Sequence, residues 1–279
     1  MKVVDIATSI AINTLPMLAL VLLAMLAERR KPVERPALAA ARLNLPYLLV
    51  YGSSGPLTSM ALGSLTVAAV NMAGGGWISL RADGWRLLPS FLAYLLVLDL
   101  LEYLFHRAQH RFAWLWAMHS LHHSDPAMNA STVVRHFWLE PALKALTIYL
   151  LAGLLFATPG VILGMYAVLG FYHIVPHMNL RLGFGRGWWL LNSPQFHRIH
   201  HSALPQHYNC NFASLFPAFD LLFRTHHVPQ PGEFPPTGLD QAPTTLWQAF
   251  SWPFRYRQPA DEASAPAPSS NPAVRNTSK

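Results

Sequence analysis

The stretch His119-Ser120-Leu121-His122-His123 places three histidines within five residues, and the same H-x-x-H-H pattern returns as His197-Arg198-Ile199-His200-His201. Residues three and four positions apart are neighbours on a helix surface. Each stretch therefore predicts a helix whose first imidazole lies beside those of the fourth and fifth residues. Such a helix would supply about half of a metal site.

Two further histidine pairs share the spacing of four. His106 and His110 form one pair, and His173 and His177 form the other, although Pro176 disfavours a regular helix there. A lone histidine is most often structural, but this clustering favours metal binding, and ten imidazoles suit two ions better than one. The candidate ligands are His106, His110, His119, His122, His123, His173, His177, His197, His200 and His201.

The composition indicates a membrane protein. Of the 279 residues 52% are hydrophobic and only 12% are charged, against roughly 25% charged in soluble domains. The net charge of +7 has a topological explanation, because basic residues cluster at 29–42, directly after an apolar run. We therefore expect a membrane environment and no nucleic-acid partner.

Apolar runs at 10–27, 45–73, 87–105 and 141–172 are the candidate membrane segments. The second contains glycines and Pro56, which predicts a kinked or partly re-entrant span, and the last is broken at 158–160, which predicts a helical hairpin or a pair dipping through one leaflet. The N-terminus is expected to face outward. The histidine-rich regions 106–123, 173–177 and 197–201 then lie on the cytoplasmic face. The predicted fold is an all-α, polytopic membrane helical bundle with a cytosol-facing, histidine-rich di-metal cap.

Three regions are expected along the chain. Residues 1–94 hold the N-terminal membrane spans and loops, and residues 95–228 hold the catalytic region with its membrane hairpin. Residues 229–279 form a Pro-rich C-terminal segment, whose last twenty residues are mostly Pro, Ala, Ser and Asn. That composition predicts disorder at the end and tolerance of truncation beyond about Gln258.

Ligand chemistry narrows the choice of metal. Cys210 is the only cysteine, which excludes a Cys-rich zinc or iron–sulfur site. Imidazole suits zinc, copper, iron and nickel, whereas a structural zinc site closes at four ligands. By analogy, a ligand-rich site for two metals at a membrane surface favours iron and oxygen chemistry.

The order of these motifs resembles the fatty acid hydroxylase and sterol desaturase superfamily of integral membrane di-iron oxygenases. The likeness covers residues 95–226, from Asp99-Leu100-Leu101-Glu102-Tyr103 to the segment 219–225. Phe219 and Arg224 depart from it, because the family usually has tryptophan and glycine there. Between these ends the pattern continues through Leu115, Trp116, Ser124, Asn129, Thr132, Arg135, Glu140, Tyr208 and Asn209.

The resemblance implies a centre of two Fe ions that uses O2 and two electrons to hydroxylate an unactivated C–H bond of a lipid. The electrons would come from an external donor, cytochrome b5-like or ferredoxin-like. A lipid or sterol desaturase with the same site is the close alternative. A zinc-dependent membrane hydrolase and a haem-binding membrane protein are more distant ones, and the hydrolase lacks an H-E-x-x-H motif.

Several residues outside the ligand set are candidates for supporting the ligands or lining the substrate cavity. Asp99 and Glu102 are expected either to accept an imidazole N–H or to pair with Arg107 or Arg111. His207 stays unassigned. His226 and His227 are excluded from the metal centre because they lack a third histidine three or four residues before them. The remaining candidates are Asn129, His136 and Asn209.

Overall fold

The structure is a computed structural model that describes residues 3–35 and 38–257. The end of the chain, where we predict disorder and tolerance of truncation, lies outside the described residues. The described part is mostly helical and has almost no strand, which confirms the predicted fold class. Its one sheet has two short parallel strands, β1 (Ile78–Ser79) and β2 (Phe156–Ala157), which pair Ile78 with Phe156.

The long helices form the membrane-facing body. They are α1 (Val3–Glu28), α2 (Leu38–Met72) and α3 (Leu87–Arg111). A helical hairpin packs against α2 and α3, as predicted for 141–172. Its first arm comprises α5 (Glu140–Lys144), a π-helical turn (Ala145–Tyr149) and α6 (Leu150–Leu155), and its second arm comprises α7 (Gly160–Leu169), a 3₁₀ turn (Gly170–His173) and α8 (Ile174–His177).

Within the described residues, three helical stretches are long and apolar enough to cross a membrane: Ala7–Glu28, Gly84–Arg111 and Gly160–His177. Large apolar side chains such as Leu23, Leu92 and Val168 are exposed on them, as expected for surfaces that contact lipid. These helices indicate a membrane protein. Helix α2 is 35 residues long but is not among the three, and it runs as one helix through Pro46 and Pro56.

Glycines allow the turn after α2 to reach the tip of the hairpin. Gly76 has a φ of +75°, which L side chains rarely adopt. Its N–H bonds the carbonyls of Gly153 and Leu154 at 3.0 and 2.8 Å. A Cβ on Gly75 would lie 3.0 Å from the Leu154 backbone. This close approach joins the N-terminal helices to the hairpin beside β1 and β2.

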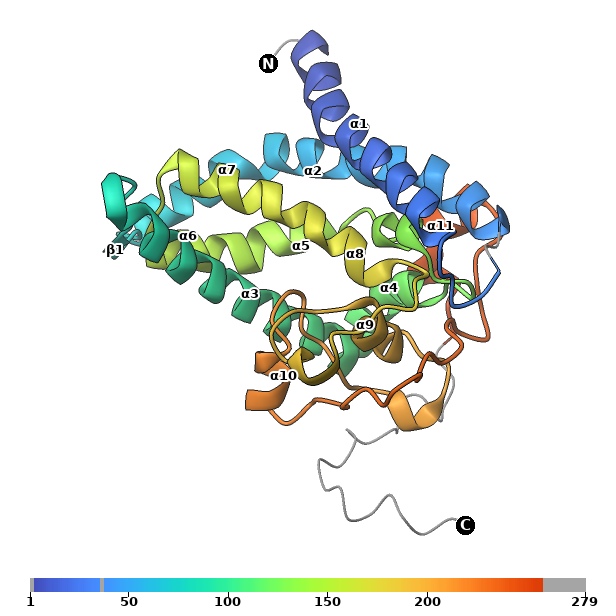
Figure 1. Cartoon of the computed structure of the whole chain (residues 1–279). Helices are drawn as coiled ribbons and strands as arrows, with labels where there is room; N and C mark the ends of the chain where they lie inside the picture. The colour runs from blue at the N-terminus through green and yellow to red at the C-terminus, as the bar shows by residue number, and fades with distance from the viewer. Residues whose placement is uncertain (1–2, 36–37, 258–279) are drawn as a thin grey trace.

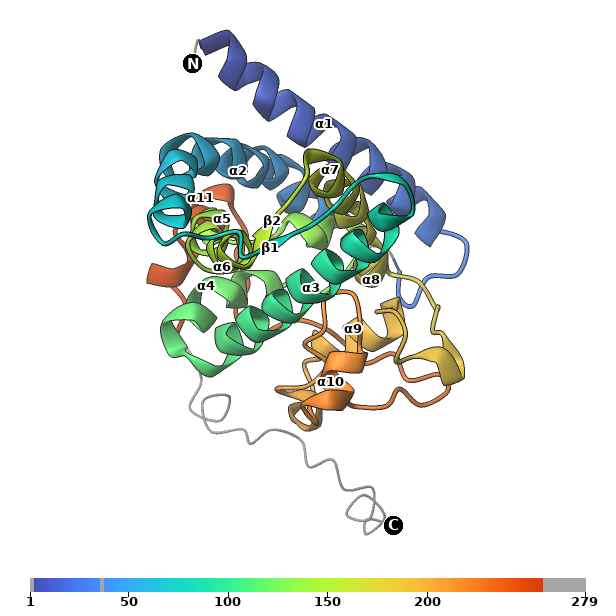
Figure 2. The same cartoon turned by 90° about the vertical axis from the view of Figure 1, so that its left-hand side faces the viewer.

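Short helices and loops form a cap at one end of the body (Figures 1 and 2). Part of the Pro-rich segment belongs to the core of this end, because Ala249, Trp252 and Tyr256 pack against Tyr47 and Trp116. The short helices are α4 (Ala113–His123), the 3₁₀ turn Ala130–Val134, the 3₁₀ turn Gly185–Gly187, α9 (Pro194–His200), the 3₁₀ turn Pro205–His207, α10 (Ala218–Leu222), α11 (Leu246–Phe250) and the 3₁₀ turn Trp252–Phe254.

Candidate metal centre

The structure brings nine of the ten candidate histidines into two groups that could each hold a metal ion. In each group, one ring nitrogen per residue lies within 4.8 Å of the others. The five-histidine cluster draws on α3, α4 and α9. The four-histidine cluster draws on α4, α8 and α9. Their members are His106, His110, His119, His123 and His200 in the first, and His122, His177, His197 and His201 in the second.

Each H-x-x-H-H stretch contributes to both clusters, rather than forming half of one site as its spacing suggested. His123 belongs to the five-histidine cluster, whereas the adjacent His122 belongs to the other. In the second stretch the order is reversed, because His200 belongs to the five-histidine cluster and His201 to the four-histidine cluster. The reason is helical geometry, since adjacent residues point about 100° apart around a helix axis. One motif can therefore supply ligands to both clusters.

The four-histidine cluster has the spacing of a coordination sphere. His177 Nε2 lies 3.1 Å from His122 Nε2 and 3.0 Å from His197 Nε2, and His197 Nε2 lies 3.2 Å from His201 Nε2. Imidazole nitrogens each about 2 Å from one metal would lie about 3 Å from one another. The rings of His123 and His201 stack at 4.3 Å, so the two clusters adjoin.

Buried, unpartnered nitrogens in the five-histidine cluster show that its residues fit a metal. The Nε2 atoms of His106, His110, His123 and His200 are buried and have no hydrogen-bond partner among the described residues. Each buried polar atom left unpaired costs about 1–3 kcal/mol. A bound cation would engage all four lone pairs at once, so the donor set suits a metal such as iron.

Backbone carbonyls orient three of the candidate ligands. The Nδ1 atoms of His106, His177 and His200 donate to carbonyl oxygens at 2.7, 2.7 and 2.8 Å, respectively. A proton on Nδ1 leaves the lone pair on Nε2, which faces the cluster. For His106 and His200, the accepting carbonyls belong to Phe212 and Cys210.

Two buried carboxylates fix the loop that supplies these carbonyls. Asp220 accepts the N–H groups of Phe212 and Ala213 at 2.8 and 2.7 Å. Asp99 accepts those of Leu215 and Phe216, both at 2.9 Å. Asp99 therefore takes neither role expected from the sequence, because it holds the backbone rather than an imidazole or an arginine. Asp220, Cys210 and Phe212 gave no sequence signal of this role, since the contacts depend on long-range folding.

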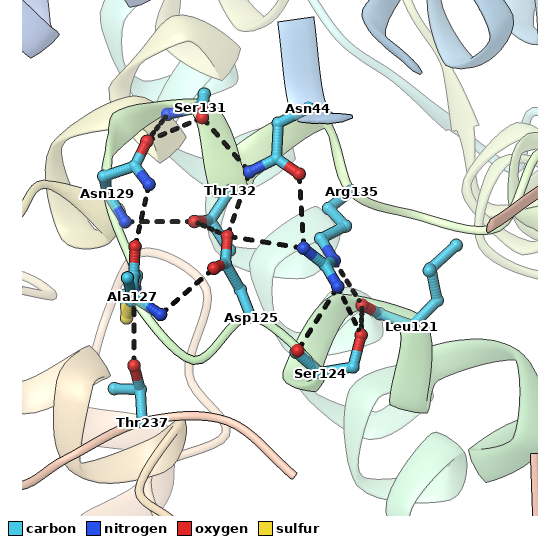
Figure 3. Close-up of polar contacts among 11 residues, drawn as sticks. Asn44, Leu121, Ser124, Asp125, Ala127, Asn129, Ser131, Thr132, Arg135 and Thr237 are labelled. Atoms are coloured by element: carbon cyan, nitrogen blue, oxygen red, sulfur yellow. Dashed lines mark hydrogen bonds and ion pairs between the residues drawn. The ribbon is translucent and has the colours of Figure 1, made fainter. Parts of the chain in front are cut away.

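A polar network closes the C-terminal end of α4, the helix that carries three candidate ligands (Figure 3). The Arg135 guanidinium donates to the carbonyls of Leu121 and Ser124 at 3.0 and 3.2 Å. It thus adds hydrogen bonds to carbonyls at the end of the helix, where the regular intrahelical hydrogen bonds stop. Asp125 accepts from Asn44 Nδ2 at 2.9 Å, which ties this end to α2.

Asn129 belongs to the same network and not to the metal centre. Its side-chain oxygen accepts the Ser131 N–H and hydroxyl at 3.0 and 2.6 Å (Figure 3). It therefore caps the turn that follows α4. Its support for the ligands is indirect, through the position of Arg135.

The environment keeps the cap histidines neutral. Burial lowers the pKa of His200 to about 3. Burial, and then neighbouring imidazoles, hold the pKa of His122, His123, His197 and His201 well below the usual value for histidine. Desolvation disfavours the charged imidazolium. The rings therefore remain neutral and able to donate a lone pair at physiological pH.

His173 and His136 lie beside the clusters. His173 is in neither cluster, and its Nδ1 lies 3.4 Å from Ser214 Oγ. The 3₁₀ turn changes to α8 between positions 173 and 174, whereas His106 and His110 both lie on the regular helix α3. His136 stacks on His122 at 4.1 Å, and its Nδ1 lies 3.0 Å from Glu140 Oε2.

Two adjoining cavities reach the clusters from the membrane-facing body. The nearer, about 190 Å³, is lined by His106, His119, His122, His177 and His197 among others. The farther, about 650 Å³, lies between α3 and the hairpin and is lined by aromatic and aliphatic residues such as Tyr94, Phe156, Leu163 and Tyr166. Both cavities share the lining residues Glu102, Lys144, Gly170 and His173.

Glu102 forms an ion pair at this junction instead of contacting Arg107 or Arg111. Lys144 Nζ lies 2.8 Å from Glu102 Oε2 and 3.7 Å from Glu140 Oε1. Sequence reasoning missed Lys144, although an ionisable residue at the edge of an apolar segment is a useful signal. Asn209 lines a separate pocket of about 40 Å³ with His110, His123, His200 and His201.

Comparisons with known proteins agree with this site. Residues 91–225 match the family model of fatty acid hydroxylase. The chain is 27% identical over 175 residues to alkylglycerol monooxygenase of Caenorhabditis elegans, covering 60% of this chain and 34% of the relative. It is 32% identical over 145 residues to alkylglycerol monooxygenase of Homo sapiens, covering 50% of this chain and 30% of that protein.

A bacterial relative matches a similar region. Ornithine lipid hydroxylase OlsE of Rhizobium tropici is 28% identical over 151 residues, covering 53% of this chain and 44% of the relative. The chain thus spans less than half the length of these curated relatives, and no solved structure matches it. The family match includes every histidine of both clusters. Together these matches support assignment of residues 91–225 to the fatty acid hydroxylase superfamily.

Proposed function

We propose that this chain is a membrane-bound di-iron oxygenase that hydroxylates an unactivated C–H bond of a lipid. The observation that carries this proposal is the junction of two imidazole clusters with a cavity that extends into the membrane-facing body. A metal-binding group buried next to a space of this size can act on a molecule that enters from the bilayer.

The nine clustered histidines are the proposed ligands of two iron ions. When bound, iron supplies the activation of O2 that attack on an unactivated C–H bond requires. The protein holds the imidazoles neutral and aims their Nε2 atoms through carbonyl contacts. We assign His173, the tenth candidate, to the wall shared by the two cavities rather than to a metal.

A lipid is the proposed substrate class. Alkylglycerol monooxygenase and ornithine lipid hydroxylase are both named for lipids. In this chain the larger cavity has apolar walls that would accept an acyl or alkyl chain and exclude water. The Glu102–Lys144 pair at its inner end would contact a polar part of the substrate or limit how far the acyl or alkyl chain enters the cavity.

The reaction also needs O2 and two electrons from outside. We propose a separate cytochrome b5-like or ferredoxin-like donor. Such a carrier would approach the cap, whose helices α4 and α9 carry histidines of both clusters.

Product mass tests the reaction. The purified protein in lipid vesicles, supplied with iron, O2 and a reducing system, should add one oxygen atom to a lipid. Loss of two hydrogens would instead identify the desaturase alternative. Cleavage of the lipid by a zinc-loaded, iron-free protein would support the hydrolase and contradict the proposal. His122→Ala is the control that should abolish the product.

We further propose several membrane passes with the clusters on the cytoplasmic face. The basic residues Arg29, Arg30 and Lys31 follow the first candidate span and favour this orientation. A reporter fused to the C-terminus should read as cytoplasmic, since Trp252 and Tyr256 pack against Trp116 on α4, the helix that carries three cluster histidines. A reporter that reads as external would contradict both the topology and the cytoplasmic site.

A further inference from the structure

We infer that His207, His227 and Glu233 form a zinc site, separate from the two histidine clusters, that cross-links the loops of the cap. One ligand atom from each of the three residues lies within 4.8 Å of the other two. Both imidazoles are buried, each only 4% exposed. The three residues come from the turn Pro205–His207 and from the segment that follows α10.

The distances among the three side chains suit a shared metal ion. Glu233 Oε1 lies 3.3 Å from His207 Nε2 and 3.0 Å from His227 Nε2. Two nitrogens and one carboxylate oxygen, each about 2 Å from a zinc ion, would have this separation. The side chain of Glu233 is 21% exposed, so a water molecule can complete a four-coordinate sphere and an ion can enter.

The atoms behind the proposed ligands are held in the way that metal sites require. His207 Nδ1 lies 2.9 Å from Ser202 Oγ, which orients the ring so that Nε2 faces Glu233. The Gln230 N–H donates to Glu233 Oε2 at 2.8 Å, which leaves Oε1 directed at both imidazoles. Hydrogen bonds of this kind fix the orientation of metal ligands and raise their basicity.

The ligand set favours zinc. Two imidazoles and one carboxylate are a common zinc combination, and zinc needs no redox partner. The set differs from the two histidine clusters, whose candidate ligands are all imidazoles. The two sites can therefore hold different metals in one chain.

The proposed zinc would brace the loop that orients the main ligands. His227 and Asn211 are joined by hydrogen bonds in both directions, at 2.7 and 3.3 Å. Asn211 lies between Cys210 and Phe212, whose carbonyls hold His200 and His106. A zinc ion that joins His207 to His227 would therefore tie the segment before these two carbonyls to the segment after them.

Metal content tests the inference directly. Protein purified with zinc and iron present should hold one more zinc per chain than the His227→Ala and Glu233→Gln variants. His226→Ala is the matched control and should keep the zinc of the unsubstituted protein, because His226 stacks on Trp188 and is not in the group. Equal zinc in all four proteins would overturn the site and leave only a hydrogen-bonded triad.

A second measurement does not depend on the folding of variants. Anomalous diffraction at the zinc edge, from crystals of the unsubstituted protein, should show a peak between the rings of His207 and His227. The position of the peak distinguishes this site from any zinc in the two clusters. The absence of a peak there after incubation with zinc would overturn the inference.

Discussion

At the scale of single residues, three candidate ligands, His106, His177 and His200, are each held through Nδ1 so that Nε2 can bind metal. His200 shows the arrangement, because its Nδ1 is bound to the Cys210 carbonyl while its buried Nε2 has no partner among the described residues. His122 combines ring stacking on His136 with a short approach of its Nε2 to His177. Removal of either imidazole should leave a metal-ligand position that no neighbouring side chain can occupy.

We therefore expect His122→Ala and His200→Ala each to lose bound iron and hydroxylase activity. A loss of 10- to 100-fold in metal affinity follows removal of even an outer-shell partner, so removal of a ligand should exceed that. Iron content and turnover are the measurements. His226→Ala is the control and should keep most of both, since His226 lies outside the clusters. Collapse in the control with retention in the other two would refute the ligand assignment.

The histidine spacing in the sequence pointed to all nine histidines that the structure gathers into the two clusters, and their binding of metal stays a prediction. It did not predict which metal each histidine serves, since the division of His122 from His123 depends on how the two clusters sit around α4. It also placed His173 among the candidate ligands, whereas in the structure this residue belongs to neither cluster. The roles of Asp99 and Asp220 could not be predicted, because their partners are distant backbone amides.

At the scale of elements, α4 depends on Arg135 for its end. This helix has only 11 residues, and short helices are marginal without tertiary support. Arg135 is 2% exposed and donates to two carbonyls and the Ser124 hydroxyl. The motif spacing predicted α4 but could not show what stops it at His123.

We expect Arg135→Ala to lower the free energy of unfolding by at least about 1.5–3 kcal/mol, the cost of losing hydrogen bonds from a charged donor. Arg135→Lys should recover little, because a lysine cannot form the planar fork. Thermal melting and iron content are the measurements, and both should fall together if α4 loses its end. Substitution of the exposed Arg186 by Ala is the control. Unchanged melting in Arg135→Ala would show that the network does not stabilise α4.

At the scale of the whole molecule, the apolar runs predicted most of the body and the hairpin, because hydrophobicity and length directly reflect the bilayer. The run at 45–73 was harder to interpret. Its glycines and Pro56 suggested a kinked or partly re-entrant segment. In the structure α2 continues through them to Met72 and is not among the candidate spans, so the kink and the re-entrant position stay predictions. The packing of Trp252 and Tyr256 into the core was also not evident, since proline-rich composition hides isolated aromatic anchors.

The burial of so many neutral imidazoles should make the metal-free protein unusually sensitive to acid. In the unfolded chain a histidine binds a proton near pH 6.5, whereas burial keeps the pKa of the folded cap histidines well below this, about 3 for His200. Between these values the unfolded state binds more protons, so stability is complete above pH 6.5 and is lost as the pH falls. Each such histidine contributes about 1.4 kcal/mol per pH unit in that window.

The measurement is the melting temperature of chelator-treated protein in detergent, from pH 7.5 down to pH 5. The melting temperature should fall steeply below pH 6.5. That of His200→Ala should fall less steeply, because this variant has one buried imidazole fewer. His226→Ala should follow the unsubstituted protein. Iron-loaded protein should resist the first part of the fall, since bound metal competes with protons for the same lone pairs. A flat profile for the metal-free protein would mean that the imidazoles open to water when the metal leaves, and that the cap does not hold its ligands in place without it.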